Sequence, residues 1–161
     1  MSAGSVRLFE LDTLVRLSRE RERAVGRRVV SVQPVARLAV PAGMQQPLGC
    51  DAVAIPAEFG PHLLARLPRV GCVYEDGPRW WWIVPADSDV ALEWPSSAYY
   101  SRGALLPPDS MREPVLVHRP ETPEGPGNAA PHTPYTPPIP LYLALCRMAG
   151  AVPGWASAVR A

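Results

Sequence analysis

Three acidic residues in the middle of the chain have a spacing that suits a bound metal ion. Asp87 and Asp89 are separated by one residue, and Glu93 follows four positions after Asp89. In an extended segment, residues two apart point to the same side, where two carboxylates can hold Mg²⁺. Asp and Ser also favour turns through hydrogen bonds to their own backbone, so the alternative is a turn over residues 86–89.

A run of three tryptophans offers a different chemistry. In a strand, Trp80 and Trp82 point to one face and Trp81 to the other. If one face is core, an indole on the opposite face is available to stack on a nucleic-acid base. The alternative is that all three rings fill the core, as tryptophans on strands usually do.

Arginines are the second feature that points to nucleic acid. A helix is predicted over residues 8–28, and Arg19, Arg23 and Arg27 share one of its faces. Such a row can follow a phosphate backbone, or this helix can form a dimer interface. Glutamates lie between the arginines, so a solvated helix surface is the alternative.

Several kinds of site are excluded by composition. All sixteen basic residues are arginine, so a Schiff base, a lysine general base and a phosphate-loop lysine are all ruled out. No serine lies in a Gly-x-Ser-x-Gly elbow. The three cysteines have no metal-ligand or redox spacing, which predicts free thiols in a reducing cytoplasm. We expect no cofactor and no membrane segment.

The elements that position these residues predict an α+β fold with a mainly antiparallel sheet. Its expected parts, besides the helix over 8–28, are strands at 51–55, 71–74, 80–84, 90–94 and 115–118 and helices at 58–67 and 139–149. The Asp-Gly dipeptide at 76–77 predicts a hairpin. The proline-rich stretch 119–138 predicts an extended, poorly packed loop. The domain is expected over 29–150, followed by a tail at 151–161.

The last predicted helix is apolar nearly all round, so it must be buried in the domain or against a partner. If it docks to a protein partner, Leu141, Tyr142 and Leu145 would make the contact. Together with the proline-rich loop, this helix makes a protein–protein adaptor the alternative function.

Four segments of the chain resemble the primase–polymerase domains of actinobacterial bifunctional DNA primase/polymerase proteins, and their short degenerate relatives most of all. The resemblance covers about residues 45–150, and the segments are 50–60, 77–85, 101–110 and 114–118. It implies an α+β fold and an ancestral nucleotide or nucleic-acid groove.

The resemblance does not extend to the catalytic residues. Where the active family has two metal-binding aspartates, this chain has Ala54 and Pro56, and Trp82 stands about where the family has a histidine. Two-metal phosphoryl transfer needs clustered carboxylates. The expected function is therefore a catalytically inactive module that binds nucleic acid or a nucleotide. A residual metal-dependent enzyme that uses Asp87, Asp89 and Glu93 is the remaining alternative.

In such a module, five residues within the resemblance are expected to line the groove. Arginines would meet phosphate and aromatic rings would stack on a base. The five residues are Arg79, Trp81, Tyr99, Tyr100 and Arg102. The expected partners are DNA, a nucleotide, a protein or a second copy of the chain.

Overall fold

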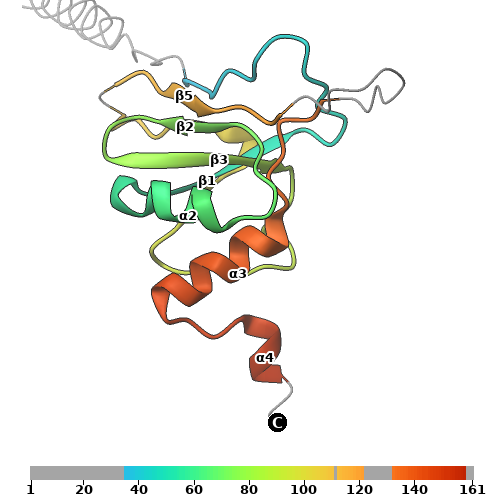
Figure 1. The fold of residues 1–161 in the computed structure, drawn as a ribbon, viewed down its shortest axis with the longest axis vertical. Helices are drawn as coiled ribbons and strands as arrows, with labels where there is room; N and C mark the ends of the chain where they lie inside the picture. Colours follow the sequence, from blue (N-terminus) through green and yellow to red (C-terminus); the bar gives the residue numbers. More distant parts are fainter. Residues whose placement is uncertain (1–34, 111, 122–131, 159–161) are drawn as a thin grey trace, which may run out of the picture. The chain divides into compact units, whose positions relative to one another are not determined.

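The computed structural model describes residues 35–110, 112–121 and 132–158, which belong to one compact unit, Val35–Ala161. The helix predicted over 8–28 lies outside the described residues, and with it Arg19, Arg23 and Arg27. The fold is α+β, as the sequence predicts: a five-stranded antiparallel sheet with helices packed on it (Figure 1).

The sheet has the strand order β4-β1-β3-β2-β5, and every neighbouring pair is antiparallel. The strands are β1 (Cys50–Pro56), β2 (Val73–Glu75), β3 (Arg79–Pro85), β4 (Tyr99–Ser101) and β5 (Val115–His118). The two longest strands, β1 and β3, lie next to each other at the centre, and their inner residues are buried. These two buried strands fix the positions of the polar residues at their ends and in the loop after β3.

The hairpin between β2 and β3 is confirmed. Its two turn residues are Gly77 and Pro78, and the backbone N–H of Asp76 donates to the carbonyl of Arg79 at 3.1 Å. Gly77 has φ = 101°, a conformation that a side chain would disfavour. Asp76 thus lies just before the turn, where its side chain is free to make other contacts.

The sheet is covered on both faces. Trp82 lies on the face packed by helices α2 (Gly60–Arg66) and α3 (Pro138–Ala149), whereas Trp81 lies on the other face among Tyr74 and Ala54. The predicted alternation of the tryptophans is therefore confirmed. The expectation that one face leaves an indole in solvent is wrong for Trp81 and Trp82, because both are fully buried.

The helices match the sequence pattern closely. A 3₁₀ turn (Ala57–Phe59) leads into α2, and α3 ends at Gly150, whose φ of 64° is the left-handed conformation typical of a helix C-terminus. A short helix, α4 (Gly154–Ala158), occupies the part of the chain expected to be a tail. None of the helices in the described ranges has the length and apolarity needed to cross a membrane.

Two local predictions are wrong. Residues 90–94 form no strand, because Trp94 packs in an aromatic cluster with Tyr100 and Tyr142 instead of joining the sheet. The described parts of the 119–138 loop are not poorly packed, since Pro134 and Thr136 are buried. The carbonyl of Pro134 accepts from the N–H of Cys72, which holds this part of the loop against the sheet.

Candidate functional site

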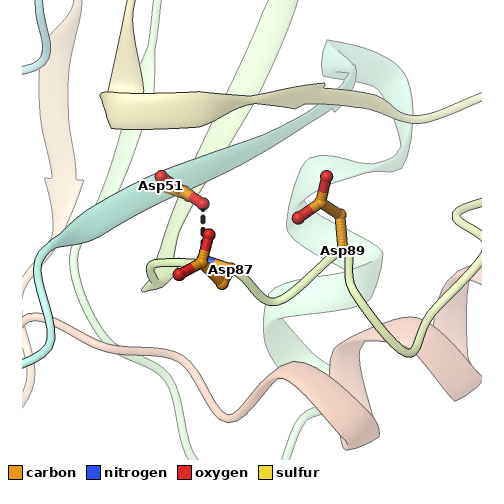
Figure 2. A group of neighbouring side chains, drawn as sticks. All are labelled: Asp51, Asp87 and Asp89. Atoms are coloured by element: carbon orange, nitrogen blue, oxygen red, sulfur yellow. Dashed lines mark hydrogen bonds between the residues drawn. The ribbon is translucent and has the colours of Figure 1, made fainter.

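Three carboxylates from separate parts of the chain come together at one end of the sheet. Asp51 comes from β1, and Asp87 and Asp89 come from the loop that follows β3 (Figure 2). One oxygen from each lies within 4.8 Å of the others. The turn over 86–89 is present, with Asp87 at φ = 61°. Glu93, expected in the same group, is not part of it.

Asp51 is the centre of this cluster because three donors converge on its buried carboxylate. The backbone N–H of Asp87 and the hydroxyl of Tyr100 donate to Oδ2, at 2.9 and 2.5 Å, and the N–H of Gly103 donates to Oδ1 at 2.7 Å. Burial and this hydrogen bond to Asp51 raise the pKa of the Tyr100 phenol. Asp51 therefore ties the loop after β3 to strand β4 and the turn that follows it.

The remaining charge in the cluster is partly balanced by Arg102. Its Nε and Nη2 both donate to Oδ2 of Asp89, at 3.1 and 2.8 Å, which raises the pKa of the guanidinium. The sequence predicted that Arg102 binds phosphate and offered Asp89 as a metal ligand. In the structure these two side chains form an ion pair with each other. Both oxygens of Asp51 and one oxygen of Asp89 accept hydrogen bonds, and these bonds connect the loop after β3 to strand β4 and the turn that follows it.

Arg79 and Trp81 are also brought together, in a second polar group behind the hairpin. The buried Asp76 accepts from the backbone N–H of Arg79 and from the indole N–H of Trp81, both at 2.9 Å. The guanidinium of Arg79 lies 5.4 Å from the Trp81 ring centre and 3.4 Å from Asp76. Trp81 has no exposed face on which a base could stack. Of the expected aromatic residues, Tyr99 is 48% exposed.

The residues expected to dock a protein partner are not on the surface. Leu141, Tyr142 and Leu145 are buried, and the two leucines pack on the same sheet face as Trp82. The apolar helix α3 is therefore buried within its own domain. An adaptor would have to use other residues.

The positions that the resemblance matches to catalytic residues do not share one face. Ala54 is buried beside Trp81, on the face away from the helices. Val53 pairs with Trp82, so position 82 lies on the helix-covered face. A histidine at position 82 would thus point away from a carboxylate at position 54.

A groove between α2 and α3, about 460 Å³ in volume, gathers basic side chains. His62 and Arg66 contribute from α2 and Arg147 from α3, and no carboxylate of the described residues lines the groove. Neither arginine lies within ion-pair distance of an acidic group in the described ranges. The groove floor includes Leu67 and Met148.

Sequence reasoning missed Asp51 and this groove. The signal for Asp51 is a single charged residue at the start of an otherwise apolar strand. The signal on α2 is the i, i+4 spacing of His62 and Arg66, which places both on one helix face. Nothing in the sequence brings Arg147 to them, because that contact depends on how the two helices pack.

We found no match for this chain among protein-family models, curated proteins or solved structures.

Proposed function

We propose that this domain is a binding module for a phosphate-bearing ligand, either a free nucleotide or a single strand of nucleic acid, and that it does not catalyse nucleotidyl transfer. The observation that carries the proposal is the α2/α3 groove, which is lined by His62, Arg66 and Arg147 and by no carboxylate of the described residues.

The charge of the groove is what selects a phosphate. Arg66 and Arg147 each lie in the last turn of their helix, where a positive side chain is favoured by the helix dipole. That effect accounts for an arginine at each helix end, but it does not require the two to face one groove. Two guanidinium groups beside one cavity, with no acidic partner in the described ranges, attract an anion and can hold phosphate through paired N–H donors.

The shape of the groove suits the rest of a nucleotide. Its volume falls in the range of about 300–1,000 Å³ that is usual for small-ligand sites. The partly exposed side chains of Leu67, Leu143 and Met148 form an apolar surface between the two helices. A base or sugar ring against this surface would place its phosphate beside the arginines.

Our proposal that the domain does not catalyse nucleotidyl transfer is supported by the residues at the positions that the family resemblance matches to catalytic ones. Ala54 and Pro56 offer no metal ligand, and Ala54 is covered by the core on its face of the sheet. In the nearest carboxylate group, both oxygens of Asp51 accept hydrogen bonds from donors of its own chain, and Asp89 is paired with Arg102. Nucleotidyl transfer needs free carboxylates to hold two metal ions.

The test is fluorescence anisotropy with a labelled oligothymidylate, with ATP as competitor. We expect the double variant Arg66→Ala, Arg147→Ala to weaken oligonucleotide binding by about tenfold or more, the loss of two charge-assisted contacts. Arg112→Ala removes an exposed arginine outside the groove and is the matched control. Competition by ATP identifies a nucleotide site, and binding without competition identifies a strand site. Equal losses in the double variant and the control would refute the proposal.

We place this module in the cytoplasm. The three cysteines are free thiols, and two of them, Cys72 and Cys146, are buried. A reducing compartment keeps such thiols unpaired. Burial raises the pKa of the Cys72 thiol to about 11, which lowers its reactivity.

A second candidate function, protein interaction, is favoured by the exposed apolar edge of β5. Val115, Leu116 and Val117 are all exposed, and none of the described strands pairs with the outer edge of β5. The occupant we propose is a second copy of the chain. Because Glu113 and Arg119 flank β5 at opposite ends, antiparallel pairing of two β5 strands places opposite charges beside each other.

Sedimentation equilibrium tests this second candidate. We expect a dimer that Leu116→Lys converts to a monomer, because a buried lysine at the centre of the paired edge is unfavourable. Val90→Lys, at an exposed position in the loop after β3 and outside strand β5, is the control and should leave the dimer intact. A monomer at all concentrations would remove this candidate.

A further inference from the structure

A second pocket, of about 390 Å³, lies between the loop after β3 and helix α4, and its chemistry is the opposite of the groove between α2 and α3. Its polar groups are the carboxylates of Asp89 and Glu93, and its apolar walls include the rings of Tyr142 and Trp155. No arginine or histidine of the described residues lines it. From this combination we infer that the pocket binds an organic cation, a guanidinium or alkylammonium group.

The first support is an unused acceptor. Arg102 binds only Oδ2 of Asp89, and Oδ1 is shielded from solvent with no hydrogen-bond partner among the described residues. The Asp89 side chain as a whole is 22% exposed. A small rotation of its carboxylate would offer Oδ1 to a ligand N–H and remove the cost of an acceptor without a donor. Glu93 forms no ion pair within the described ranges and adds a second negative charge at the same pocket.

The second support is the aromatic wall. Trp155 is 46% exposed, and its ring centre lies 5.2 Å from that of Tyr142 beneath it. Tyr142 in turn contacts Trp94 edge-on at 5.6 Å, and its hydroxyl accepts from the N–H of Gly154, so α4 is held in place. An exposed indole face next to carboxylates attracts organic cations through its electron-rich ring.

The same features argue against a metal ion in this pocket. Hard divalent cations such as Ca²⁺ and Mg²⁺ need a shell of oxygen ligands, whereas Trp155, Leu92 and Val90 offer none. A guanidinium or alkylammonium group carries one positive charge next to apolar atoms, so it matches both walls.

The experiment is an NMR titration that follows the indole N–H of Trp155, assigned with the variant Trp155→Phe. The probes are Nα-acetyl-arginine amide and spermidine at millimolar concentration, with the neutral Nα-acetyl-citrulline amide as the matched analogue. We expect a saturable shift with a cation and binding at least tenfold weaker with citrulline. Preference for arginine amide identifies a peptide side chain as the source, and preference for spermidine identifies a free polyamine.

Two variants make the result specific. Glu93→Gln keeps the size of the side chain and should weaken binding by about fivefold to tenfold, the effect of one partly shielded charge. Glu58→Gln, an exposed carboxylate outside the pocket, should leave the affinity unchanged. If citrulline binds as well as arginine, if no probe shifts Trp155, or if the two glutamine variants behave alike, the inference is wrong.

Discussion

Two pockets of similar size on one small domain carry opposite charge. Among the described residues, the groove between α2 and α3 is lined by Arg66 and Arg147 and by no carboxylate, whereas the pocket beside α4 is lined by Asp89 and Glu93 and by no basic residue. Both use α3, which supplies Arg147 to one and Tyr142 to the other. The net charge of +1 gives no sign that positive and negative side chains line separate pockets.

The difference between the two regions also lies in what supports them. The groove is built on helices whose apolar faces pack on the sheet, so its position follows from hydrophobic burial. The pocket is built on a loop, and that loop is held by the hydrogen bond from Asp87 to Asp51. Its geometry therefore depends on a buried polar network, which is lost more abruptly than apolar packing when one member is removed.

The largest expected effect comes from Asp51→Ala. Loss of this carboxylate leaves three donors without an acceptor, and we expect the free energy of unfolding to fall by about 3 kcal/mol. Because Asp51 holds the loop that carries Asp89, the affinity for arginine amide should fall, while oligonucleotide binding in the other groove stays near its original value. Urea unfolding followed by the two binding assays measures both.

The control for this change is Asp109→Ala. Asp109 is an exposed carboxylate with a loose 3.5 Å contact to Arg79, so its removal should cost less than about 0.5 kcal/mol. Equal losses of both ligands in Asp51→Ala would show that the two regions unfold together, and the comparison between them would fail.

A smaller effect is expected from Gly60→Ala, which acts on the groove. A Cβ atom at this position would lie 2.2–2.6 Å from the indole of Trp80, so α2 must shift. We expect a loss of about 2 kcal/mol in the free energy of unfolding, the usual cost of overpacking, together with weaker oligonucleotide binding.

Gly154→Ala is the matched glycine variant in the other region. A Cβ atom there has its nearest neighbour at 3.7 Å, the Oε2 of Glu93, which is an ordinary contact. Its stability should therefore change by less than about 0.5 kcal/mol. Thermal or urea unfolding of the two variants side by side decides whether α2 is the more tightly packed of the two helices.

The smallest expected difference is in salt dependence. Two arginine–phosphate contacts to a single strand predict that raising salt fourfold weakens oligonucleotide binding by about sevenfold. Arginine amide carries a single charge, so its affinity for the cation pocket should fall only about twofold over the same range. Both Kd values measured at low and at physiological salt test this, and equal slopes would mean that phosphate contacts do not hold the oligonucleotide.

Predictions based on short-range patterns agree best with the structure. The strand at 51–55, the hairpin after Tyr74, the strand at 115–118 and the helix at 139–149 were all readable, because alternation, turn residues and capping act within a few positions. The strand predicted at 90–94 is absent because the conformation of this segment depends on a long-range contact. The sequence pattern covers only five residues, whereas the conformation depends on the packing of Trp94 against Tyr142, 48 positions away in the chain.

The candidate sites show the same limit more strongly. Arg79, Trp81, Tyr100 and Arg102 were identified as a group by residue type, and the fold does give each a polar partner. Those partners are aspartates of the same chain, Asp76, Asp51 and Asp89. A sequence shows which side chains can bind a phosphate, but it does not show which of them are paired with a carboxylate of the same chain in the folded protein.

The amino-acid sequence by itself determined the α+β class, the alternation of the tryptophans and the need to bury the last helix, because each depends on apolar periodicity along a short segment. It left open whether that helix packs in its own domain or against a partner. Only the tertiary structure decided which charges meet. Asp51 contacts residues 36 to 52 positions away, and Arg66 and Arg147 share a groove across 81 residues. The strength of an electrostatic interaction depends on the distance between the two charged groups, and that distance is set by the folded structure.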